Sequence, residues 1–481
     1  MTKIKVIAQA RTGPSLESTV VTVEDGDIDA WANSILENLP RLKSQTSSIV
    51  TIPRVPERLR LGENDAYEPK IISFGPYHHG EEKLEAMEKH KWSHLEKILS
   101  RNQEIPLKYY INEIKEQEEV IRSCYSGHFV MNSKDFVEMM LIDACFIVEH
   151  LLQIHENVVD DELFSSMKCV CDLILYDILL LENQLPFFIL DGIFDMAITQ
   201  SSSIDTDSYP SSFTLLAIDY LNNLTDEKSN LPPPESIQHL LHIYHSFCLY
   251  TLNEEENRSS TIKIGGGDDE LVSNTNNEEF FLTIPSATAL EEAGIEFMRK
   301  DVEGSKLDVT FSKGKMMIPP LLINSFTKTK FRNLIAFEQF SLGTGSELYK
   351  NFTAYADFIA SIVRTHKDVA LLYDKGIILH TLGSHIEVAD ILCHVNRGAC
   401  SPADNYVIDI YKEVMSTFTS FSLMTTPRKV SMRKRREEID GVCYAQFPSS
   451  NQSHLHREVL RLDGYQVIIE GDSVLVCSSH V

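Results

Sequence analysis

The sequence predicts a mainly α, multi-helix globular domain with a small β-hairpin, a disordered insertion and disordered tails. Three observations lead to this fold class. Apolar residues recur at helical spacing in several long segments, whereas one short segment alternates apolar and polar residues around a glycine turn. Stretches rich in serine, asparagine and glycine separate these segments, and such stretches contain too few apolar side chains to form a packed core.

The most apolar run of the chain is DLILYDILLLENQLPFFILDGIF, residues 172–194. We do not expect it to span a bilayer, because it contains ionisable and amide side chains at Asp177, Glu182, Asn183 and Gln184. We expect buried helices at about 161–184 and 186–199, since Pro186 disfavours helical geometry in the residue before it. Glu182, Asn183 and Gln184 then lie at a buried helix corner, where free backbone groups need partners.

The second strongest helix is predicted at 135–152, DFVEMMLIDACFIVEHLL. At 100° per residue, three of its apolar side chains fall within about 40° of one another, namely Phe136, Met140 and Ile147. Asp143 lies inside the wider apolar arc, whereas Glu138 and Glu149 lie on the opposite side. Asp143 is therefore a candidate buried carboxylate.

Helical periodicity also indicates helices at 81–99, 108–124, 237–252, 287–297, 331–340, 355–364 and 386–395. The first of these places Lys91 close to an apolar face with Leu84, Met87, Leu95 and Ile98. The segment LDVTF–SKGK–MMIPPLLI alternates apolar and polar residues around a glycine turn, which predicts a β-hairpin at 307–318.

The same patterns predict one α-rich domain over residues 47–400. Before it we expect a poorly ordered leader, 1–46, and after it a divergent tail, 401–481. The segment 254–279 is polar, acidic and rich in glycine, so we expect a disordered insertion there. A serine-rich loop is predicted at 201–212.

Composition excludes several functional classes. A formal charge of −26 over 481 residues argues against a general nucleic-acid binder and against adsorption of the whole surface onto anionic lipid. Nine scattered cysteines without framework spacing indicate reduced thiols in a cytosolic setting. The first residues, MTKIKVIAQARTGPSLE, contain no apolar signal region, and no window has the pattern of a transmembrane helix. These features predict a soluble cytoplasmic protein.

Several motifs together resemble the plant-specific domain of unknown function 247 family over roughly residues 50–400. In chain order they are IPRVPERLR, AYEPKIISFGPYHHG, FVEMMLIDACFI, LLLENQLPFF, IPSATALEEAGIEF, IPPLLI, RNLIAFEQ and KDVALLYDKGII. The resemblance implies a predominantly helical protein for which no enzymatic activity is established. Some relatives are linked to grass self-incompatibility, which implies recognition or signalling. Relatives usually end in a transmembrane helix, often at the plasma membrane, whereas the tail of this chain shows no such segment.

His90 and His94 are the strongest metal-binding candidates in the sequence. They stand at i and i+4 in HKWSH, a spacing that can direct two imidazoles at one metal ion. The glutamate that follows the first histidine in zinc proteases is missing, and two histidines on a charged helix usually face solvent. We therefore expect no metal ion or other cofactor.

Asp143, Glu182 and Glu338 are carboxylates within apolar helices, so two of them facing across a cleft could act as general acid and base of a hydrolase. The alternative is that each is a structural group paired with helix-end amides or with Arg332 and Asn333. We favour the second interpretation, because no nucleophile elbow or histidine partner accompanies the three. The predicted structural polar core comprises Asp143, Asp177, Glu182, Asn183, Gln184, Arg332, Asn333 and Glu338.

The only basic cluster of this acidic chain is RKVSMRKRR, residues 428–436. Its densest part, Arg433, Lys434, Arg435 and Arg436, could serve as a nuclear import signal or as a peripheral contact to anionic lipid. The simplest interpretation is a solvated tail.

The function that these observations favour is non-enzymatic recognition, signalling or scaffolding through contacts with an unknown protein partner. The alternative is a hydrolase that uses buried carboxylates in a helical cleft. The two hypotheses differ in one structural expectation: an enzyme needs the carboxylates to line an open pocket, whereas a scaffold buries them with hydrogen-bond donors in reach.

Overall fold

The computed structural model describes most of the chain between residues 50 and 425. The described ranges are 50–127, 129–158, 168–199, 209–225, 237–249, 284–301, 307–340, 351–400, 405–425, 457–462, 465–470 and 473–478, together with residues 33, 34 and 36. The acidic insertion 254–279, the basic cluster 433–436, nearly all of the leader and most of the loop 201–212 lie outside them. The chain divides into two units, Met1–Val50 and Thr51–Val481, and the fold below is that of the second.

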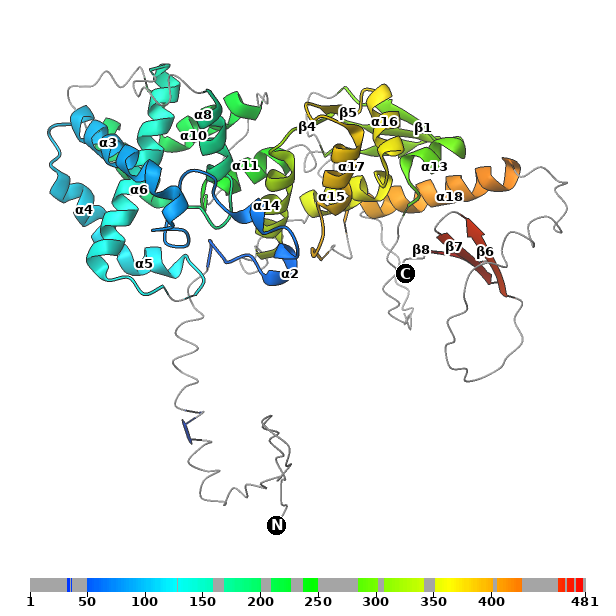
Figure 1. The fold of residues 1–481 in the computed structure, drawn as a ribbon, viewed down its shortest axis with the longest axis horizontal. Coiled ribbons are helices and arrows are strands. Elements are labelled where there is room, and N and C mark those ends of the chain that lie inside the picture. The colour runs from blue at the N-terminus through cyan, green and yellow to red at the C-terminus, as the bar shows by residue number, and fades with distance from the viewer. Residues whose placement is uncertain are drawn as a thin grey trace, which may run out of the picture. The chain divides into compact units, whose positions relative to one another are not determined.

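Helices make up the first part of this unit (Figure 1). In chain order they are α2 (Glu57–Arg60), η1 (Asn64–Tyr67), η2 (Glu82–Leu84), α3 (Glu85–Arg101), α4 (Leu107–Glu116), α5 (Glu118–Ser123), α6 (Ser133–Glu156), α8 (Lys168–Ile178), α9 (Phe187–Phe194), the π-helical turn η3 (Asp195–Thr199), α10 (Phe213–Thr225) and α11 (Leu240–Leu249). Helix α6 contacts α3, α4, α9 and α10, so nearly every residue from Phe136 to Gln153 is buried.

The second part combines helices with short strands (Figure 1). Its elements are α13 (Ala287–Glu292), β1 (Glu296–Arg299), β2 (Thr310–Ser312), β3 (Lys315–Ile318), β4 (Leu321–Ile323), α14 (Thr327–Phe340), α15 (Asn351–Ile362), α16 (His366–Asp374), β5 (Ile378–His380), α17 (His385–His394), α18 (Val407–Thr425), β6 (Arg457–Leu462), β7 (Tyr465–Glu470) and β8 (Ser473–Ser478). The predicted mainly α fold is confirmed.

The described residues form three small sheets besides the helices. In the first, strand order is β1–β3–β2, with β1 parallel and β2 antiparallel to β3. Strands β4 and β5 form a parallel pair, and β6, β7 and β8 form an antiparallel meander. One contiguous core of buried apolar side chains extends from Ile52 to Val414. Among the described helices, none is both long and apolar enough to cross a membrane.

The predicted β-hairpin is confirmed as β2 and β3, with Thr310 opposite Met317. Its turn residues Lys313 and Gly314 have φ angles of 52° and 76°. Two positive φ values are characteristic of a type I′ turn, whose twist matches that of the flanking strands. The glycine in SKGK thus marks the turn.

The helix predicted at 287–297 is too long. Helix α13 ends at Glu292, Gly294 adopts a φ of 101°, and Phe297 lies in β1 opposite Met316. A positive φ ends a helix at little cost when the residue is glycine. Pairing with β3, which is distant in sequence, then determines the conformation of the next four residues.

The helix predicted at 108–124 is divided at Gln117 into α4 and α5. The Gln117 side chain donates to the carboxylate of Glu113 at 2.7 Å and to its carbonyl oxygen at 3.4 Å, which helps to satisfy the end of α4. Helices α10, α16 and α18 were not predicted from periodicity.

Helix α18 begins beyond residue 400, where the domain was predicted to end. Val407 and Val414 are fully buried, and the Tyr411 ring stacks on Phe358 with centroids 6.3 Å apart. The Tyr406 hydroxyl donates a 2.7 Å hydrogen bond to the carbonyl oxygen of Leu307, next to the first sheet. The packed domain therefore continues into the first part of the predicted tail.

Candidate functional site

The polar residues of the central run lie between two helices. Helix α8 ends at Ile178 and α9 begins at Phe187, so the first predicted helix is shorter than expected. Asp177, Glu182, Asn183 and Gln184 are at most 2% exposed. Each of these side chains is hydrogen-bonded to backbone groups. Several of these groups belong to segment 52–75, which contains α2 and η1.

Asp177 binds the backbone of this segment through three hydrogen bonds. Its carboxylate accepts from the amides of Lys70, Ile71 and Ile72 at 2.7, 2.8 and 2.9 Å. Burial raises the pKa of Asp177 to about 6, against the effect of the three amides, which favour the carboxylate. The Asp177 carboxylate thus satisfies the backbone amides of residues 70–72, as the carbonyl groups of a neighbouring strand would.

Asn183 and Gln184 explain why α8 ends early. Asn183 Nδ2 donates to the carbonyl oxygen of Asp177 at 3.0 Å, and Gln184 Nε2 donates to those of Ile178 and Leu180 at 2.5 and 2.7 Å. These carbonyls would otherwise need backbone amides of a continuing helix. Asn183 Oδ1 also accepts from the Phe74 amide at 2.7 Å, so the same corner holds segment 52–75.

Asp143 forms a buried ion pair with Lys91. Its Oδ1 lies 2.8 Å from Lys91 Nζ, and its Oδ2 accepts from the amide of Gly75 at 2.9 Å. Lys91 Nζ also contacts Glu88 and the carbonyl oxygen of Ser73, each at 2.7 Å. Burial lowers the pKa of Lys91, but the carboxylates of Asp143 and Glu88 raise it, and the net shift is upward. The lysine therefore carries its charge inside the core.

Both carboxylate oxygens of Glu182 are paired with donors from residues 54–60. Its Oε1 accepts from the Val55 amide at 2.5 Å and pairs with Arg60 at 2.7 Å, whereas Oε2 pairs with Arg54 at 3.2 Å. His78 Nε2 lies 3.9 Å from the same Oε2. The Glu182 side chain is fully buried.

Glu338 caps the start of α15. Its oxygens accept from the amides of Phe352 and Thr353 at 2.9 and 2.7 Å, and from the Thr353 hydroxyl at 2.5 Å. His245 Nε2 lies 2.8 Å from Glu338 Oε1, and both side chains are at most 1% exposed. The expectation that no histidine accompanies these carboxylates was therefore wrong for Glu338. A signal was present in the spacing of His239, His242 and His245 along the apolar pattern of α11.

Arg332 and Asn333 do not pair with the three carboxylates, contrary to one expectation from the sequence. Arg332, only 1% exposed, donates to carbonyl oxygens and to one hydroxyl: Leu59, His394, Val395, Arg397 and the Tyr67 hydroxyl. Asn333 accepts from the Leu181 amide at 2.9 Å and donates to the Ala66 carbonyl oxygen at 2.8 Å. These two residues join α14 to both segment 52–75 and the central corner.

The predicted histidine pair is not arranged for a metal ion. His94 is fully buried, its Nδ1 lies 2.8 Å from the carbonyl oxygen of His90, and its ring packs on Phe146 with centroids 4.5 Å apart. The expectation that both histidines face solvent was wrong for His94. Among the described residues, no group of three or more histidine, cysteine or acidic side chains could hold a metal ion.

Sequence reasoning also missed a second buried charge cluster. Arg101 binds Glu149 at 2.6 and 3.0 Å and Glu156 at 2.7 and 2.9 Å. Glu149, placed opposite the apolar arc by its angle on the helix, is only 2% exposed because α3 and its arginine cover that side of α6. The sequence signal for the burial of Glu149 was the high apolar content of α6, which has no wholly polar face.

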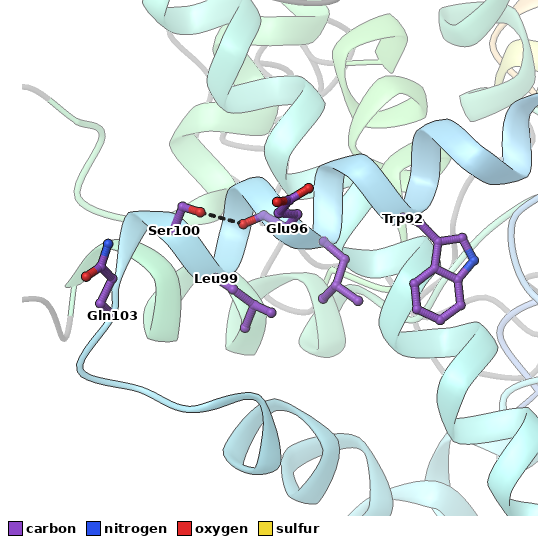
Figure 2. Close-up of a pocket in the computed structure, with 6 residues that line it drawn as sticks. Trp92, Glu96, Leu99, Ser100 and Gln103 are labelled. Atoms are coloured by element: carbon purple, nitrogen blue, oxygen red, sulfur yellow. Dashed lines mark hydrogen bonds between the residues drawn. The ribbon is translucent and has the colours of Figure 1, made fainter.

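A shallow hollow of about 330 Å³ lies on the outer side of α3 (Figure 2). Its lining residues are Trp92, Leu95, Glu96, Leu99, Ser100 and Gln103. Trp92 and Leu99 project from the same side of the helix, and the Trp92 side chain is 51% exposed (Figure 2). None of the candidate carboxylates lines this hollow.

The fold and these contacts define a class: a mainly α protein whose buried charged and amide side chains hold segment 52–75 against its helices. The chain belongs to the DUF247 family, described as plant proteins of unknown function, whose model matches residues 52–437. It is 29% identical over 385 residues to the UPF0481 protein At3g47200 of Arabidopsis thaliana, covering 78% of each chain. It is 25% identical over 421 residues to the putative UPF0481 protein At3g02645 of the same plant, covering 71% of this chain and 77% of the relative. No solved structure matches.

Proposed function

We propose that this chain is a non-enzymatic recognition or scaffold protein that acts through protein–protein contacts. The carrying observation is that Asp143, Glu182 and Glu338 are each at most 2% exposed and already bound to several donors. A catalytic acid or base must reach the substrate. Carboxylates that are saturated by backbone amides and buried cations support a structural role.

The hollow on α3 is the contact surface that we propose for the partner (Figure 2). Tryptophan is enriched among the residues that dominate binding energy in protein interfaces, and Trp92 is half exposed there. Five of the six lining residues belong to the single helix α3, which suits a second helix packed alongside. Glu96 is the charged residue of the lining, so the partner helix carries an apolar stripe and a basic residue opposite Glu96.

The loops 201–212 and 254–279 remain our proposed source of specificity. Binding residues are found disproportionately on loops that a rigid scaffold holds in place. The described part of this chain offers such a scaffold, since one contiguous core joins its elements. Exchanging either loop for a glycine–serine linker of equal length would alter which partners bind without unfolding the domain.

The test uses a display library of amphipathic helical peptides selected against the full-length chain. Selected peptides are then titrated by fluorescence anisotropy against wild type, Trp92→Ala and the control Tyr109→Ala, an aromatic residue of α4 that is 52% exposed. We expect at least about a tenfold loss of affinity for Trp92→Ala, a typical effect at an interface hot spot, and no loss for the control. Equal affinity for all three proteins would show that the hollow is not the contact surface.

The hydrolase alternative is tested on the same preparations. Wild type, Asp143→Asn, Glu182→Gln and Glu338→Gln are incubated with ester, peptide and glycoside substrates while unfolding is followed by circular dichroism. We expect no turnover in any protein and lower stability in the three variants. Turnover by wild type that a folded carboxylate variant loses would overturn the proposal of a non-enzymatic protein.

A further inference from the structure

Two imidazoles meet where β5 ends and α17 begins. The rings of His380 and His385 lie 5.2 Å apart between centroids at an interplanar angle of 78°. The Tyr373 ring, from the end of α16, packs against both, at 5.4 Å from His380 and 5.2 Å from His385. Both histidines are half-buried, so solvent reaches the cluster.

The backbone orients one of the two histidines. Nδ1 of His380 lies 3.1 Å from the carbonyl oxygen of Leu382. Since a carbonyl oxygen only accepts, Nδ1 must carry the hydrogen, and Nε2 keeps its lone pair for a ligand. A carbonyl oxygen bound to the second ring nitrogen is the usual support of a metal-ligating histidine.

The second histidine is available as well. In the part of the chain that the structure describes, the His385 imidazole makes ring contacts but no hydrogen bond. It differs in this respect from His94, whose ring is buried and whose Nδ1 lies against the backbone. His385 is also the first residue of α17, so its backbone is fixed by the helix.

The spacing of the rings suits one shared ion. Imidazole nitrogens bind Zn²⁺ at about 2.0–2.1 Å, and two of them at a tetrahedral angle bring their ring centroids to roughly 5 Å. The observed separation is 5.2 Å. We propose that His380 and His385 together bind one divalent transition-metal ion of the imidazole-preferring class, Zn²⁺, Cu²⁺ or Ni²⁺, with water completing its coordination.

The experiment titrates Zn²⁺ alone into chelator-treated full-length chain at pH 7.5 by calorimetry. The variants are His380→Gln and His385→Gln, and the control is His366→Gln, an exposed histidine of the neighbouring α16. We expect wild type and the control to bind one more ion per chain than either variant does.

A second readout identifies the ligands directly. With Cu²⁺ as probe, electron paramagnetic resonance of the wild type should show coupling to two imidazole nitrogens, reduced to one in each variant. Unfolding temperatures measured in chelator establish that the variants are folded. An unchanged number of bound ions in both variants, or loss in only one of them, would overturn the shared site and leave the three rings as a packing contact.

Discussion

Lys91 Nζ lies 2.8 Å from Asp143 Oδ1, with the lysine side chain fully buried and the aspartate 2% exposed. This ion pair joins α3 to α6. Through Ser73 and Gly75, it also binds segment 52–75, whose backbone amides donate to Asp177 and Asn183 as well. The pair is therefore one point of a polar core that fixes segment 52–75 to the helices.

Replacing Lys91 with methionine should remove the cation that pairs with Asp143, a carboxyl whose pKa is already raised by burial. Removing one partner of a buried ion pair costs about 3–5 kcal/mol of stability. We expect the free energy of unfolding in urea to fall by about that amount. Lys89→Met, at an exposed position two residues earlier on α3, should change it by less than about 0.5 kcal/mol. Similar values for the two variants would mean that the pair contributes little.

The stability of the domain should fall on acidification below about pH 6.5. Burial lowers the pKa of His242 to about 4 and that of His150 to about 3, and it lowers the pKa of His239 well below 6.5. Between pH 6.5 and 4 the unfolded state therefore binds protons that the folded state does not, so stability decreases as pH falls. The raised pKa values of Asp143, Asp177 and Asp191 have the opposite effect. The lowered pKa values of Glu118, Glu156 and Asp368 add to the loss of stability at low pH.

His242→Gln tests the histidine contribution. A pH of 5 lies about 1.5 units below the pKa of a histidine in the unfolded state. For His242 this difference corresponds to about 2 kcal/mol of unfolding free energy. The difference in unfolding free energy between pH 7.5 and pH 5 should therefore be smaller by about 2 kcal/mol in His242→Gln than in wild type. His366→Gln, an exposed position, should keep the wild-type pH dependence. A His242→Gln profile identical to wild type would contradict this assignment.

Gly398 and Gly80 form a matched pair for a backbone experiment. Both have positive φ angles, 81° and 79°, so alanine is strained at either position. A Cβ at Gly398 would lie 2.0 Å from the carbonyl oxygen of Arg58, whereas one at Gly80 meets nothing within 4 Å. We expect Gly80→Ala to cost about 1–2 kcal/mol. Gly398→Ala should cost clearly more in urea unfolding, because α2 must separate from the turn after α17. Equal costs would show that the backbone moves freely there.

The alternative in which the basic cluster contacts anionic lipid, in place of a solvated tail, predicts salt-sensitive binding. Each lysine or arginine near such a surface contributes about 1 kcal/mol, and salt screens the attraction. In vesicle sedimentation, neutralising Arg433, Lys434, Arg435 and Arg436 with glutamine should abolish binding to phosphatidylserine vesicles, as should high salt. A control with four exposed lysines replaced, Lys89, Lys108, Lys134 and Lys412, should still bind. Loss of binding in both proteins would indicate a net-charge effect without a specific site.

The sequence by itself determined the mainly α class, the family and several elements that leave a local pattern. Helices α6 and α14 were evident because packing against a core imposes apolar spacing near 3.6 residues. The β2–β3 hairpin was evident because its turn requires a glycine at positive φ. That Asp143 and Asp177 are buried also followed from their apolar neighbours, since burial depends mainly on the local pattern.

The tertiary structure alone decided what these polar residues bind. Asp177 accepts from an amide 107 residues away, and Arg332 donates to carbonyl oxygens of both the 59–67 segment and the 394–397 turn. No local spacing records such partners, because a carboxylate or guanidinium can be satisfied by any donor or acceptor that the fold brings near. Strand β1 shows the same limit: its residues continue a helical pattern, but parallel pairing with β3 determines their conformation.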